Sequence, residues 1–140
     1  MEPGNEFSFK KIMVIEDSEI DRYVMSQIMQ RCRFAEDIIM LSSASDALLQ
    51  LEQLSTNPDE LPQLIFLDIH MPKMNGFAFL AELKTKYDHL KEKMAVVILT
   101  ISLDPINLQT SHSYSNVKMY LNKPLNIEML EQVRSSVLFK

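Results

Sequence analysis

The chain has 140 residues, about one domain, and with 46% hydrophobic and 24% charged residues it has the composition of a globular protein, not a disordered or fibrous one. A single cysteine, Cys32, excludes a disulfide framework and a cysteine-based zinc site. The net charge of -5 argues against direct binding of nucleic acid, which requires clustered lysine and arginine. No stretch approaches the roughly 18–20 apolar residues of a membrane span, and no signal sequence follows Met1, so we expect a cytoplasmic protein.

Five short apolar runs alternate with segments of helical periodicity along the chain. The runs are residues 11–15, 38–41, 64–67, 95–99 and 117–121. Continuous hydrophobicity is typical of strands buried on both faces, as in a parallel sheet covered by helices. We therefore predict an α/β protein with a (βα)5 arrangement, a doubly wound five-stranded parallel sheet of order 2-1-3-4-5 and a flavodoxin-like fold.

Apolar stripes and capping residues predict the helices between these runs. Ile20, Val24 and Ile28 recur at helical spacing up to about residue 32, and similar stripes follow the second and third runs. Asp104-Pro105 offers a helix start before a weak polar helix. Asn126 caps a last helix whose inward residues are Ile127, Leu130, Val133 and Val137. We expect residues 1–8 to form a flexible leader and residues 9–140 a single domain.

Polar residues stand where four of the five predicted strands end. They are Glu16 and Asp17, Asp68, Thr100 and Lys123. Neighbouring strands lie about 4.8 Å apart, so the three carboxylates should share one crevice and attract a divalent cation. Oxygen ligands favour Mg²⁺, while a hydroxyl and a lysine suit a tetrahedral anion. Together these groups predict phosphoryl transfer.

Four motifs carry a resemblance to a known family. They are Ile15-Glu16-Asp17, Phe66-Leu67-Asp68-Ile69-His70-Met71-Pro72-Lys73-Met74-Asn75-Gly76, Leu99-Thr100 and Tyr120-Leu121-Asn122-Lys123-Pro124. In this order they resemble the receiver domain of two-component response regulators, the chemotaxis-Y-like family, over about residues 9–139. Each motif alone is weak evidence, whereas the set is highly specific.

The resemblance implies a function and a metal site. Asp68 would accept a phosphoryl group from a sensor histidine kinase or a histidine phosphotransfer protein. Asp17, Asp68 and the backbone carbonyl of His70 would bind Mg²⁺, with Glu16 helping directly or through water. The chain would then be a phosphoacceptor signalling domain whose only reactions are its own phosphorylation and dephosphorylation.

The resemblance also implies a switch. Lys123 would pair with the phosphoryl group, Thr100 would move to donate a hydrogen bond to it, and Tyr120 would follow Thr100 inward. These changes would alter a protein–protein surface that an unidentified downstream protein recognises. Three residues depart from the family pattern: Glu16 replaces the commoner aspartate, Ile101 follows Thr100 in place of a small residue, and Asn116 stands where a glycine is usual.

Other interpretations remain open at this point. Glu16-Asp17-Ser18 alone would read as a helix N-cap, and Tyr120 is as consistent with a core residue as with a switch. A haloacid-dehalogenase-type phosphatase needs an acid two residues after its aspartate, where this chain has His70. A pseudo-receiver adaptor usually lacks an acidic or lysine position that is present here. A flavodoxin needs a phosphate cradle where this chain is acidic.

Overall fold

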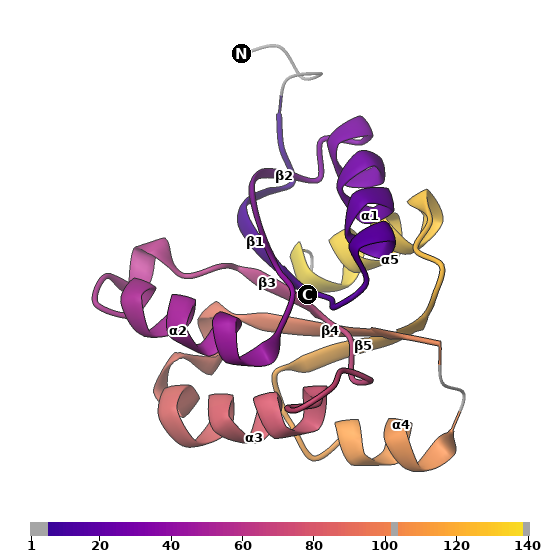
Figure 1. Ribbon diagram of the computed structural model, residues 1–140. Coiled ribbons are helices and arrows are strands. Elements are labelled where there is room, and N and C mark those ends of the chain that lie inside the picture. Colours follow the sequence, from indigo (N-terminus) through magenta and orange to yellow (C-terminus); the bar gives the residue numbers. More distant parts are fainter. Residues whose placement is uncertain (1–5, 102–103, 139–140) are drawn as a thin grey trace.

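The computed structural model describes residues 6–101 and 104–138 and shows one five-stranded parallel sheet, as predicted (Figure 1). The strand order is β2-β1-β3-β4-β5, which confirms the expected topology. The strands are β1 (Phe9–Ile15), β2 (Ala35–Leu41), β3 (Leu64–Leu67), β4 (Ala95–Thr100) and β5 (Val117–Asn122). The helices are α1 (Glu19–Arg31), α2 (Ala44–Leu54), α3 (Gly76–Tyr87), α4 (Pro105–Ser111) and α5 (Ile127–Leu138), with short 3₁₀ turns η2 (Pro58–Glu60) and η3 (Asp88–Lys93). Within the described residues, no helix is both long and apolar enough to cross a membrane.

Helices cover both faces of the sheet, so the protein has two apolar cores. Figure 1 shows α1 and α5 on one face and α2, α3 and α4 on the other. Successive residues of a strand point to opposite faces. In β1, accordingly, Met13 and Ile15 pack in the core beneath α2 and α3, whereas Ile12 and Val14 pack beneath α1 and α5. Burial of every strand residue from Ile12 to Ile15 explains the continuous apolar run.

Side chains at the helix starts satisfy backbone N–H groups that have no partner inside the helix. Asp104 accepts from the Ile106 N–H at 3.0 Å, and Asn126 accepts from the Met129 N–H at 2.8 Å, so both predicted caps are confirmed. Ser18, Ser43 and Asn75 cap α1, α2 and α3 in the same way. These caps fix the residue at which each helix leaves the carboxyl edge of the sheet.

The first two strands begin earlier than the sequence patterns predicted. β1 begins at Phe9, whose side chain is buried against the ring of Phe34, with 5.0 Å between ring centroids. Phe9 pairs with Ala35, which extends β2 by three residues beyond the predicted start at residue 38. Aromatic packing at the strand ends therefore extends the pairing of β1 and β2 beyond the apolar runs of the sequence. Residues 1–5 of the predicted leader lie outside the described residues, while the Ser8 N–H donates to the Arg33 carbonyl at 3.2 Å.

The buried face of α1 includes only one residue of the predicted apolar stripe, Ile28, which packs against the core beneath α1 and α5. Ile20 and Val24 are 75% and 42% exposed, while Met25 and Met29 are buried. Met25, Met29 and Asp21 are four residues apart, so they share the face that turns toward the sheet. Asp21 forms an ion pair at the sheet edge, and this contact orients the helix together with the two methionines. The last helix shows a smaller deviation of the same kind, because its first residue, Ile127, is 44% exposed.

Candidate functional site

The ends of two central strands bring the predicted acidic residues together. β1 and β3 pair in register from Ile12 with Leu64 to Ile15 with Leu67, so the next residues, Glu16 and Asp68, are neighbours. The Asp68 N–H donates to the Ile15 carbonyl at 3.1 Å and continues this pairing. Glu16 and Asp68 are only 2% and 6% exposed, whereas Asp17 is exposed. One carboxylate oxygen from each of Glu16, Asp17 and Asp68 lies within 4.8 Å of the others.

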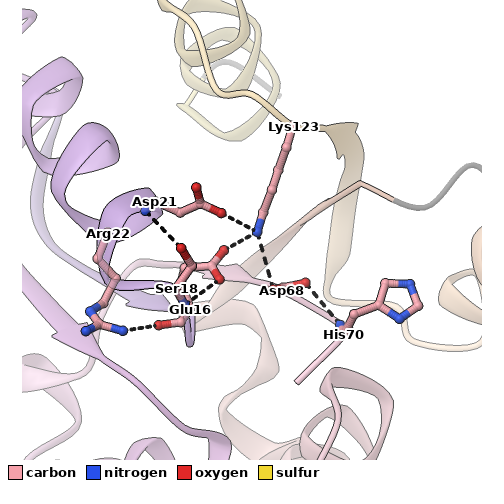
Figure 2. A network of polar contacts seen from close by, with 7 residues as sticks. All are labelled: Glu16, Ser18, Asp21, Arg22, Asp68, His70 and Lys123. Atoms are coloured by element: carbon pink, nitrogen blue, oxygen red, sulfur yellow. Dashed lines mark hydrogen bonds and ion pairs between the residues drawn. The ribbon is translucent and has the colours of Figure 1, made fainter. Parts of the chain in front are cut away.

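Lys123 is placed over this acidic group by the segment that follows β5 (Figure 2). Its backbone N–H donates to the Thr100 carbonyl at 2.9 Å, and the peptide bond to Pro124 is cis. Its ammonium group forms an ion pair with Glu16 Oε1 and lies 3.3 Å from Asp68 Oδ2. The lysine side chain is only 12% exposed, so these contacts form in a largely water-excluded setting.

A third carboxylate, which the sequence analysis missed, completes the surroundings of the lysine. Asp21 Oδ2 lies 3.0 Å from Lys123 Nζ, and Figure 2 shows Asp21 reaching toward the ammonium from the first turn of α1. Asp21 follows Asp17 by four residues, which would place both on one side of a helix that begins nearby. That spacing could have indicated Asp21 from the sequence. The sequence analysis, however, considered only the residues that directly follow a predicted strand.

The loop after β3 holds the Asp68 carboxylate from the other side. The His70 N–H donates to Asp68 Oδ1 at 3.0 Å, as drawn in Figure 2, and this is the contact that the structure gives for His70 in the site. The His70 carbonyl as a metal ligand stays a prediction. Gly76 begins α3 against this loop: a Cβ atom there would lie 2.6 Å from Ile69 Cα and 2.9 Å from the Asp68 carbonyl oxygen. Only glycine permits this approach without movement of the loop.

The two predicted switch residues lie at the ends of β4 and β5. Thr100 is fully buried and pairs with Asn122 across the two strands. Tyr120 packs at the margin of the core beneath α2 and α3, and its buried hydroxyl group has no hydrogen-bond partner among the described residues. Burial raises the pKa of Tyr120, and the charge of Asp104 acts in the same direction. Ile101, the departure from the family pattern, is 76% exposed.

Burial and neighbouring charges shift the pKa values of Glu16 and Lys123. Burial raises the pKa of Glu16 to about 7, and the charge of Asp68 adds to this, while Lys123 and the Ser18 N–H partly oppose it. Burial alone would lower the pKa of Lys123, but its hydrogen bonds to Glu16 and Asp21 outweigh burial and raise it. The lysine is therefore a permanent cation, and negative charge exceeds positive charge around it.

The donor set suits a hard divalent cation. Glu16, Asp17 and Asp68 offer carboxylate oxygens close enough to share one ion, and such oxygens are the ligands that Mg²⁺ prefers. Asp17 is exposed, so one side of this group of carboxylates faces solvent. The ammonium of Lys123 contacts two of the three carboxylates, so it competes with a cation for the same oxygens.

Comparison with known proteins shows the family of the chain. The chain is 30% identical over 122 residues to response regulator Rcp1 of Synechocystis sp., covering 86% of this chain and 81% of that protein. A two-component response regulator from Cytophaga hutchinsonii superposes with a TM-score of 0.87 at 27% identity, covering 94% and 98% of the two chains. The Mn²⁺-bound form of Rcp1 superposes with a TM-score of 0.69 at 28% identity, covering 89% and 88%. The family model of the response regulator receiver domain matches residues 12–134, and the chain belongs to that family.

Proposed function

We propose that this receiver domain accepts a phosphoryl group on Asp68 and requires Mg²⁺ for the transfer. The observation that carries the proposal is the position of Asp68 at the end of a central strand, with a backbone N–H on one carboxylate oxygen and a lysine ammonium near the other. The proposed phosphodonor is a sensor histidine kinase or a histidine phosphotransfer protein, in keeping with membership of the family. We further propose that it works in the cytoplasm, with residues 9–140 as the receiver and residues 1–8 as a leader.

The chemistry requires positioning and charge neutralisation more than a strong nucleophile. An oxygen of Asp68 forms a bond to phosphorus as the P–N bond of a phosphohistidine breaks, and the imidazole leaves with the electron pair. The Lys123 ammonium near Asp68 Oδ2 neutralises part of the charge that reaches the site. Glu16, Asp17 and Asp68, with the His70 carbonyl, would hold Mg²⁺, which would supply the remaining neutralisation when bound.

The proposed output is a change at the surface formed by α4, β5 and α5. A phosphoryl group on Asp68 adds a dianion, which favours inward movement of the Thr100 hydroxyl and of Tyr120. Ser111 is the only described residue of α4 that is buried, whereas Ile106 and Leu108 are 67% and 43% exposed. A helix with so little buried surface moves at small energetic cost, and a downstream protein would recognise its new position.

The proposed domain is an acceptor and not a turnover enzyme with another substrate. Its product, an acyl phosphate, hydrolyses spontaneously, which suits a transient signal. The exposed side of the site at Asp17 gives water and the phosphodonor a path to Asp68. The unusual Ile101 side chain is 76% exposed and lines a pocket together with Asp21 and Lys123, so it lies beside the proposed acceptor site.

The proposal is tested by chemical phosphorylation. The protein is incubated with acetyl phosphate and Mg²⁺, and the modified residue is identified by mass spectrometry. We expect one hydroxylamine-labile phosphoryl group on Asp68, no labelling in EDTA, and no labelling of Asp68→Asn, which keeps the shape but removes the nucleophile. Labelling of Asp68→Asn at the wild-type level, or labelling that ignores EDTA, would disprove the proposal.

A further inference from the structure

Lys123 has as many carboxylate partners as it has N–H groups to donate. An ammonium group carries three N–H donors. In the described structure the Lys123 ammonium contacts Glu16, Asp21 and Asp68, one oxygen from each (Figure 2). Two of these partners, Glu16 and Asp68, belong to the group of carboxylates that could hold a metal ion, and Asp21 does not. Asp21 is therefore the partner that a bound cation leaves to the lysine.

A cation on Glu16 and Asp68 weakens their hold on the lysine. Both positive groups need the same oxygens, and two cations in one crevice repel each other. Without a further carboxylate, the lysine ammonium would be more stable in water than beside the cation, and the side chain would turn away from Asp68. Asp21 Oδ2 lies 3.0 Å from the ammonium, closer than the 3.3 Å between the ammonium and Asp68 Oδ2.

The backbone of Asp21 is tied to the site, so its side chain starts from a fixed place beside the lysine. The Asp21 N–H donates to the Ser18 side chain at 3.2 Å, and the Ser18 N–H donates to Glu16 Oε2 at 3.0 Å. Arg22, the next residue, donates from Nη1 to the Glu16 carbonyl at 2.7 Å. The Asp21 side chain is 41% exposed, against 3% for Glu16, so it loses less hydration as a partner of the lysine.

We propose that Asp21 is a positioning residue that holds the Lys123 ammonium beside Asp68 while a divalent cation occupies the carboxylates of Glu16, Asp17 and Asp68. This inference rests on the proposed function, because it concerns the same metal and the same acceptor. It assigns to α1 a part in keeping the lysine available for the phosphoryl group. It also means that Asp21 favours cation binding by giving the displaced ammonium an alternative partner.

The test is Mg²⁺ affinity, measured by calorimetric titration of the unphosphorylated protein. Asp21→Asn should weaken Mg²⁺ binding about three- to fivefold, as expected for a partly exposed ion pair. Glu19→Gln is the matched control, because Glu19 is also an acidic residue of the first turn of α1 but is exposed and outside the lysine contacts. That control should change the affinity less than about twofold. Asp21→Glu should restore most of the wild-type affinity.

A double-mutant cycle separates an effect of Asp21 that acts through Lys123 from the general effect of removing one negative charge near the metal site. In a Lys123→Met background, Asp21→Asn should change Mg²⁺ affinity no more than Glu19→Gln does. An independent readout is the NMR signal of the Lys123 ammonium group, which should remain visible in the Mg²⁺-loaded wild type and broaden in Mg²⁺-loaded Asp21→Asn. This second measurement needs no variant at position 123.

The outcomes distinguish this inference from the proposed function. Wild-type protein that binds no Mg²⁺ would overturn both. Wild-type binding with equal effects of Asp21→Asn and Glu19→Gln, or an effect of Asp21→Asn that persists in Lys123→Met, would overturn the role of Asp21 alone. An unchanged ammonium signal in Mg²⁺-loaded Asp21→Asn would also overturn it, because the lysine would then be held by other groups.

Discussion

Glu16 is a 2% exposed carboxyl at the end of β1, between a lysine that stabilises its charge and an aspartate that opposes it. In the unfolded chain its pKa has the ordinary value near 4.5, and in the folded protein burial raises it to about 7. Between these pH values the folded state binds more protons than the unfolded state. The free energy of unfolding contributed by this group therefore falls as the pH rises from about 4.5 to 7.

This difference gives a prediction for Glu16→Gln in metal-free protein. The amide keeps the shape of the side chain but does not titrate, so the variant should lack this part of the pH dependence. From pH 5 to pH 8 the wild type should lose on the order of 2 kcal/mol of stability relative to the variant. The measurement is urea denaturation in EDTA across this range. Parallel pH profiles for the two proteins would contradict the raised pKa.

The elements around the acceptor meet at very short range, and Gly76 is where α3 meets the loop after β3. The position of a Cβ atom at residue 76 would be only 2.8 Å from Ile69 Cγ2 and 2.9 Å from the Asp68 carbonyl oxygen. Two of the three nearest atoms belong to the backbone of Asp68 and Ile69, so they cannot move aside as the end of a flexible side chain could. The start of α3 and the acceptor loop therefore adjust only together.

We accordingly predict that Gly76→Ala lowers the free energy of unfolding by about 1–3 kcal/mol, as overpacking does elsewhere. The added methyl group would push the loop after β3 away and displace Asp68, so the substitution should also slow labelling by acetyl phosphate. Ala78→Gly in the same first turn of α3 serves as a control, because Ala78 is exposed; it should lower the free energy of unfolding by about 1 kcal/mol without slowing the labelling. Wild-type stability and labelling in Gly76→Ala would show that the loop is more compliant than its contacts indicate.

The strand elements could be predicted from the sequence far better than the orientation of the helices. Asp68, Thr100 and Lys123 were found because the carboxyl ends of parallel strands meet at one edge of the sheet, whatever the details of packing. Asp21 was not found, because its position depends on the rotation of α1 about its own axis. The exposed Ile20 shows that apolar spacing did not define that rotation; the buried methionines and the ion pair to Lys123 did.

Over the whole molecule, the site joins residues that are far apart in the chain, so the proposed binding of a cation would be coupled to folding. Only the folded state brings Glu16 and Asp17 to Asp68. Mg²⁺ at 100 times its dissociation constant should therefore add about 2.7 kcal/mol to the free energy of unfolding, provided that the unfolded chain does not bind it.

Asp17→Asn should abolish most of this stabilisation. Asp17 is exposed and is not among the described contacts of Lys123, so the variant should keep a metal-free melting temperature equal to or slightly above that of the wild type. Thermal unfolding with Mg²⁺ and with EDTA measures both effects. A clearly lower melting temperature in EDTA would identify Asp17 as a structural residue and not a ligand.

The site residues leave the ribosome in chain order, so Glu16, Asp17 and Asp68 emerge well before Lys123. β1 and β3 are neighbours in the sheet, whereas Lys123 lies beyond β5, the last strand of the chain. Chains fold as they are synthesised, from the N-terminus onward. A nascent chain that ends before residue 117 holds the acidic residues but not the ammonium that neutralises them. The ion pairs of Lys123 with Glu16 and Asp68 therefore form only after β5 and the residue that follows it have been synthesised.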